Sequence, residues 1–205
     1  PMFGFTKSEL AILRKLNTPA KIQDFLAGIP ANFEPKGDTL KSPRRVLRDN
    51  NAHCIEGALL AAVALRLHGH DPLIMDLKSD AKDKDHVVTL FKHNGHWGAI
   101  SKTNHGVLRY REPIYRTPRE LAMSYFHEYF LDDGRKTLRS YSVPLNLSRF
   151  DSENWMTSEE DLWDIGAALP YARHFPLVNR AQIAKLRKAD PIERDMGKMT
   201  EWKRK

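Results

Sequence analysis

The segment 52–69, AHCIEGALLAAVALRLHG, limits the possible folds more than any other part of this chain. It predicts one helix that ends at Gly69, and Asn50 and Asn51 stand where residues that cap a helix are expected. The interior consists almost entirely of Ala, Leu and Val, so nearly every side of the helix is apolar. A helix of this kind is stable in water only when other elements cover it. We therefore predict a central buried helix, with the rest of the chain folded around it.

The periodicity of apolar residues changes after this helix, from helical spacing to the runs and alternation of strands. Asn94-Gly95 is a strong signal for the turn of a β-hairpin. Helices are predicted at 7–16, at 19–27, from Pro43, from Thr117 to about Tyr129 and from Thr157 to about Ala168, and strands at 72–78, 86–92, 96–101, 107–112 and 137–145. This order is typical of an α+β fold, in which helices pack on one face of an antiparallel sheet. We expect one domain over 1–179 with its core at about 43–147, and then a basic helix or tail over 180–205.

Most of the excess positive charge lies near the C-terminal end. The chain has a net charge of +7, and residues 180–205 contain nine basic and four acidic residues, which is five of those seven charges. One interpretation is a helix and tail that water surrounds, and the other is a segment that binds an acidic partner. No RNA-binding aromatic pattern or helix-turn-helix pattern accompanies the charge, which argues against nucleic acid as a partner.

The longest apolar run, 58–65, is much shorter than the roughly 20 residues that cross a bilayer. The chain shows no leader for secretion, and its single cysteine excludes an intramolecular disulfide framework and a cysteine-rich zinc module. We expect a cytoplasmic protein without a membrane partner. The chain has nine histidines, which keeps a histidine metal site open as a minor alternative. No HExxH pattern is present, so we predict no metal site and no cofactor.

The one cysteine, Cys54, lies in the first turn of the predicted central helix. The positive end of the helix dipole lowers the pKa of a thiol there, and the free N–H groups of the first turn can stabilise an oxyanion. His86 opens a strand some thirty residues later and could accept the thiol proton. The alternative is an inert buried cysteine and a hydrogen-bonded histidine at a strand edge. Glu56, a charge inside the apolar helix, is expected to pair with one of five arginines: Arg44, Arg45, Arg48, Arg109 or Arg111.

The order NNAHCIEGALLAAVALRLHGHDPLIMDL and then DHVVTLFKHNGHWGAISKTN resembles the core of the transglutaminase-like superfamily. The resemblance covers about 43–112, and four residues occupy the places of its pattern: Cys54, Gly69, His86 and Trp97. It implies a papain-like cysteine fold, with Cys54 as nucleophile and His86 as general base and then acid. The implied reaction is acyl transfer or hydrolysis of an amide or peptide through a thioester. The substrate would be a protein, a peptide or a small amide.

The sequence departs from this pattern at one position, because the Asp expected four residues after Trp97 is Ser101. Ser101 carries no charge to stabilise an imidazolium, but it or Asn104 can orient the ring of His86. Asn51 is either a helix cap or a donor to an oxyanion. Trp97 and Lys102 are the other candidates for binding substrate, and Lys102 could hold an anionic group. The missing acid also favours an alternative function, a weak or inactive binding module that uses the basic tail.

Overall fold

The structure is a computed structural model that describes residues 2–203, and its centre is a seven-stranded antiparallel sheet. The strands follow the order β4-β3-β2-β1-β5-β7, and the short strand β6 pairs with β1. Their bounds are β1 Leu73–Ser79, β2 His86–His93, β3 His96–Ile100, β4 Arg111–Tyr115, β5 Leu138–Ser142, β6 Leu145–Asn146 and β7 His174–Pro176. The predicted α+β class and antiparallel sheet are therefore present.

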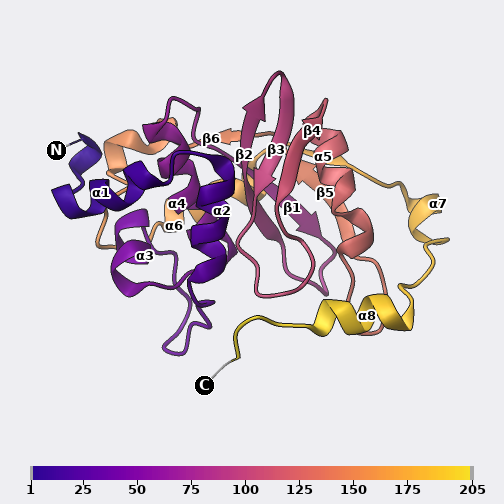
Figure 1. Ribbon diagram of the computed structural model, residues 1–205. Helices are drawn as coiled ribbons and strands as arrows, with labels where there is room; N and C mark the ends of the chain where they lie inside the picture. Colours follow the sequence, from indigo (N-terminus) through magenta and orange to yellow (C-terminus); the bar gives the residue numbers. More distant parts are fainter. Residues whose placement is uncertain (1, 204–205) are drawn as a thin grey trace.

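One face of the sheet is covered by the predicted central helix, α4, which spans Cys54–Leu67. Its residues from Ile55 to Leu65 are all buried, as their composition requires. Thr89 of β2 donates a hydrogen bond of 2.7 Å to the carbonyl of Ala58 and fixes the helix on the sheet. Four further helices surround α4 on this side (Figure 1): α1 Lys7–Lys15, α2 Pro19–Gly28, α3 Pro43–Asp49 and α6 Trp163–Tyr171.

The other face is also covered, so the expectation of helices on one face only is wrong. Helix α5, Pro118–Ser124, and the 3₁₀ helix Phe126–Glu128 pack there in a second apolar cluster. The physical reason lies in the central strands, which carry apolar side chains on both sides. Val87 belongs to the cluster around α4, whereas its neighbour Val88 belongs to the second cluster. Strands that are apolar on both faces need a cover on both faces.

Three local predictions differ from the structure. Of the predicted strand 107–112, residues 107–110 form a loop, and β4 begins only at Arg111. Asn50 ends α3 in the left-handed conformation and does not cap α4, whose N-cap is His53. The helix predicted from Thr157 begins only at Trp163, because the carbonyls of Thr157 and Ser158 bind the side chains of Arg44 and Ser42.

After β7 the chain forms α7, Arg180–Ile183, and α8, Pro191–Lys198. We call residues 189–202 the C-terminal arm, which contains α8 and in Figure 1 passes below the ends of the strands, from the side of α7 toward the side of α2 and α3. Three glycines allow close approach at its contacts, and a Cβ on Gly134 would lie 2.9 Å from the carbonyl oxygen of Ala189. The others are Gly106 and Gly197. Within residues 2–203, no helix combines the length and apolar character that crossing a bilayer requires.

Candidate active site

A pocket of about 750 Å³ lies at the end of the sheet where α4 begins. Its walls are the first turn of α4, the residues just before and at the start of β2, the loop after β3, the segment 128–133 and two residues of α8. Cys54 and His86 both line it, together with Lys102, Asn104 and Arg194. The fold therefore brings the two predicted catalytic residues to one cavity, although they lie on different elements.

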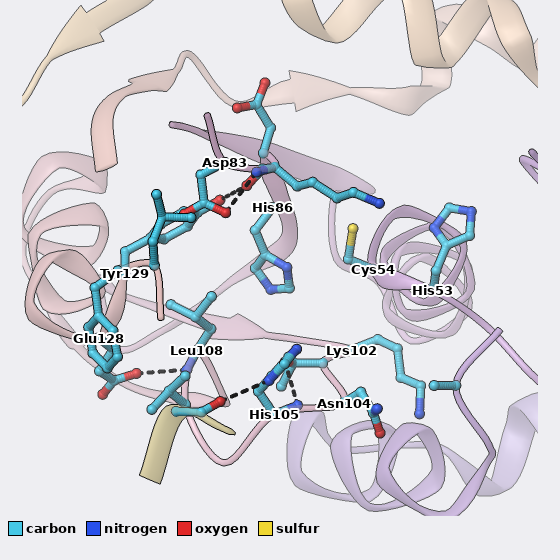
Figure 2. Close-up of a pocket in the computed structure, with 18 of the residues that line it drawn as sticks. His53, Cys54, Asp83, His86, Lys102, Asn104, His105, Leu108, Glu128 and Tyr129 are labelled. Atoms are coloured by element: carbon cyan, nitrogen blue, oxygen red, sulfur yellow. Dashed lines mark hydrogen bonds between the residues drawn. The ribbon is translucent and has the colours of Figure 1, made fainter. Parts of the chain in front are cut away.

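Cys54 is the first residue of α4, and its half-buried thiol lies between the rings of His53 and His86 (Figure 2). Burial by itself would raise the pKa of this thiol. Hydrogen bonding and positive charge from His53 and His86 outweigh the burial and hold the pKa of Cys54 well below its usual range. The site therefore favours a thiolate, which is the nucleophilic form of cysteine.

His86 is the first residue of β2, is only 7% exposed and binds Ser101 with its far ring nitrogen. Its Nε2 lies 2.8 Å from Ser101 Oγ, and that hydroxyl donates a bond of 2.6 Å to the carbonyl of Leu108. A hydroxyl has one proton to donate, so Ser101 must accept the proton of His86 Nε2. The proton on Nε2 leaves Nδ1 as the ring nitrogen that can exchange a proton with Cys54.

Ser101 is itself fixed by residues that the sequence did not single out. The side-chain amide of Gln23, on α2, accepts from Ser101 N at 2.9 Å and donates to Ser101 O at 3.0 Å. Leu108 has a φ of 60°, in the left-handed region, which a leucine rarely adopts. Glu128 accepts from the N–H of Leu108 at 2.8 Å and forms an ion pair of 2.7 Å with Arg111. These contacts aim the Leu108 carbonyl at Ser101 and so orient His86.

On the side of the thiol where His53 lies, the structure is held by Glu56, whose side chain is fully buried. The expected pairing with an arginine is wrong, because four other groups donate to this carboxylate. They are His53 N at 3.0 Å, Lys41 N at 3.0 Å, Thr39 Oγ1 at 2.8 Å and Asn32 Nδ2 at 3.0 Å. Glu56 thereby ties the loop 32–41 to the first turn of α4, next to Cys54.

Asn104 lines the pocket but does not orient His86, since Ser101 already occupies the far ring nitrogen. Its side chain instead binds the C-terminal arm. Asn104 Oδ1 accepts from the N–H of Trp202 at 2.8 Å, and Asn104 Nδ2 donates to the carbonyl of Trp202 at 2.9 Å. The N–H of Glu201 also donates to Asn104 O at 2.9 Å. These bonds attach the C-terminal arm, which is part of the predicted basic segment, to a wall of the pocket.

We predict that an Asn104→Ala variant releases the arm without changing the thiol. Loss of two hydrogen bonds that each contribute about 1 kcal/mol raises local opening roughly tenfold or more. Limited trypsin digestion should then cut after Arg194 and Lys198 faster than in the wild-type protein. The matched control is Asn17→Ala, because Asn17 is an exposed asparagine that precedes α2 and is distant in sequence from the arm. Equal cleavage rates in both variants would show that Asn104 does not retain the arm.

The remaining predicted site residues do not reach the thiol. Asn51 binds the ammonium of Lys41 through its carbonyl and side-chain oxygen and does not line the pocket, and it does not cap α4. Trp97 packs under the ammonium of Lys92, with 4.2 Å between the nitrogen and the ring centre, and is also outside the pocket lining. Neither residue is placed to bind substrate in this pocket.

Lys102 does line the pocket, but its ammonium points away from it. The side chain is buried, and Nζ donates to the carbonyls of Leu26 at 2.9 Å and Ile29 at 2.6 Å, at the end of α2. Burial lowers the pKa of Lys102 to about 8. The predicted role in holding an anionic substrate group is thus replaced by capping of a helix end.

Four residues of the site were not predicted from the sequence: His53, Gln23, Leu108 and Glu128. Only His53 carried a signal, as it precedes Cys54 and stands three residues before Glu56, the spacing of a capping box. Among residues 2–203, no group of three or more His, Cys, Asp or Glu side chains is arranged to hold a metal ion. A scan of the chain against protein-family models finds no match. A search of curated proteins finds no significantly similar sequence.

Proposed function

We propose that this protein is a cysteine-dependent acyl transferase or amide hydrolase with the papain-like arrangement of the transglutaminase-like superfamily. The hydrogen-bond chain from His86 through Ser101 to the Leu108 carbonyl carries the proposal, because it leaves Nδ1 of His86 for the thiol. A nucleophile beside a base, with the base oriented by a third group, is the arrangement of covalent catalysis.

In the first step, the Cys54 thiolate attacks the carbonyl carbon of an amide and a C–S bond forms. The carbonyl oxygen becomes an oxyanion, and N–H groups in the first turn of α4 have no intrahelical acceptor and can stabilise it. The C–N bond then breaks, and His86 donates its Nδ1 proton to the leaving amine. In the second step, water or an amine gives a proton to His86 and attacks the thioester, and the thiolate leaves.

The pocket is large enough for part of a peptide or for a small amide, and ligand sites of this volume are common. The lining includes apolar side chains such as Val107, Phe130 and Leu131 and carboxylates such as Asp132 and Asp133. A protein, peptide or small-amide substrate stays a prediction, and so does a cytoplasmic location.

The proposal predicts that Cys54 reacts as a thiolate at neutral pH. The rate of alkylation by iodoacetamide follows the thiolate fraction, so a lowered pKa places the midpoint of the rate profile below that of a free thiol, about 8.5. The rate should change little between pH 7 and pH 9. Since Cys54 is the only cysteine, intact mass measures this reaction without interference. A midpoint at about 8.5 or above would reject the nucleophile.

One observation favours a second candidate, a catalytically inactive binding module. The residue that binds His86 is a neutral serine whose own proton goes to a carbonyl, so this residue supplies no negative charge to an imidazolium. A thiol with a lowered pKa that never turns over an acyl group would support this second candidate.

A further inference from the structure

His53 has the surroundings of a charged histidine and lies on the opposite side of the Cys54 thiol from His86 (Figure 2). Its Nε2 lies 2.9 Å from the carbonyl of Thr39, which can only accept, so Nε2 carries a proton. Two carboxylate oxygens are close to the same nitrogen: Glu34 Oε1 at 3.6 Å and Glu56 Oε1 at 3.5 Å. Two negative groups at this distance favour the imidazolium form.

The other charged groups around His53 do not outweigh the carboxylates of Glu34 and Glu56. Lys41 is a cation that shares Glu56 with His53, but its Nζ lies 4.0 Å from Glu56 Oε2 and donates to the carbonyl of Asn51 at 2.9 Å. Burial lowers the pKa of His53, but hydrogen bonding to Cys54 and the charge of Glu56 outweigh it and raise the pKa to about 9. The thiol therefore has a second cationic group beside it, on the side away from His86.

We propose that His53 is a second catalytic histidine, which keeps Cys54 ionised while His86 carries the proton. This inference rests on the proposed function and assigns separate tasks to the two rings. A single histidine must stabilise the thiolate and also transfer the proton. Here the cation at His53 remains in place when His86 is neutral.

The division of tasks between His53 and His86 matters most when the thioester breaks down. Water attacks the thioester carbonyl, its proton moves to Nδ1 of His86 and a C–O bond forms. The C–S bond then breaks, and its electron pair returns to Sγ as a thiolate that faces His53. His53 stabilises this leaving group directly, whereas an acid in place of Ser101 would have stabilised the imidazolium of His86.

The test is a titration of the thiolate by its absorbance near 240 nm in the full-length protein, with Cys54→Ser as the blank. The variants are His53→Gln, His86→Ala and the double variant. The matched control is His68→Gln, a histidine at the other end of α4 that contacts the carbonyl of Leu13. Denaturant unfolding shows whether each variant is folded. Glu34→Gln keeps His53 and removes one of its carboxylates, which provides a second test if His53→Gln fails to fold.

We expect the midpoint in His86→Ala to stay at least one pH unit below about 8.5, and the midpoint in His53→Gln to rise by one unit or more. The double variant should titrate at about 8.5 or higher, Glu34→Gln should show a smaller rise and the control should not move. A low wild-type midpoint that His86→Ala alone restores to about 8.5 would overturn the inference but leave the proposed function intact. A low midpoint that His53→Gln leaves unchanged would do the same. A wild-type midpoint of about 8.5 would instead contradict the proposed function itself.

Discussion

A His86→Ala variant should transfer an acyl group through Cys54 about 10² to 10⁴ times more slowly than the wild-type protein. His86 is the ring that hydrogen bonding to Ser101 orients toward the thiol, so its loss removes both the acid for the leaving amine and the base for water. Turnover of p-nitrophenyl acetate provides the measurement, because this activated ester needs no knowledge of the natural substrate. The acylation and deacylation rates are followed separately, since deacylation requires His86 as the base that takes a proton from water.

The matched control for this prediction is His93→Ala, at the exposed end of the same strand β2. It should keep the wild-type rate. Ser101→Ala should lower the rate less than His86→Ala does, because the imidazole ring of His86 is then less firmly oriented but still present. Equal turnover in His86→Ala and His93→Ala would eliminate His86 as the proton carrier.

A Glu56→Ala variant should lose about 3–5 kcal/mol of its free energy of unfolding. The substitution removes the acceptor of four donors: two backbone N–H groups, Thr39 Oγ1 and Asn32 Nδ2. Asn32 Nδ2 keeps Thr39 Oγ1 as an acceptor at 2.9 Å and Thr39 Oγ1 has Glu34 Oε1 at 3.4 Å, so the two backbone N–H groups account for most of the loss. Each unsatisfied donor costs about 1–3 kcal/mol, and partial access of water to the loop reduces the sum. Urea unfolding monitored by circular dichroism measures the loss.

Glu153→Ala is the control for this stability prediction, because Glu153 is exposed at the end of a 3₁₀ helix. It should change the free energy of unfolding by less than about 0.5 kcal/mol. If Glu56→Ala unfolded at the same urea concentration as Glu153→Ala, the carboxylate would not hold the loop 32–41 to α4.

The buried helix and the central hairpin could be predicted because their signals are local. A helix of Ala, Leu and Val and an Asn-Gly turn between strands determine α4, β2 and β3 almost to the residue. The second helical layer was missed because an apolar run in a strand does not show how many of its faces are covered. The pattern at Thr157 failed because long-range contacts to Arg44 and Ser42 replaced the helical bonds.

Part of the candidate site could be predicted for the same reason. Cys54 and His86 stand at element ends whose position the pattern reveals, and Ser101 follows from the family resemblance, which implies an orienting group four residues after Trp97. The contacts that fix these residues come from sequence separations such as 78 residues, between Gln23 and Ser101. Asn104 illustrates the limit, since its partner Trp202 lies 98 residues away and nothing near Asn104 in the sequence points to it. Side chains fixed by distant partners require coordinates.

The most direct test of the account is the detection of an acyl thioester on Cys54. The protein is mixed with p-nitrophenyl acetate, quenched in acid and examined by intact mass and peptide mapping. We expect one acetyl group per chain on the peptide that contains Cys54, which hydroxylamine removes and which Cys54→Ser does not form. An unmodified Cys54, or an acetyl group on another residue that Cys54→Ser still forms, would contradict the claim that this thiol carries the acyl group.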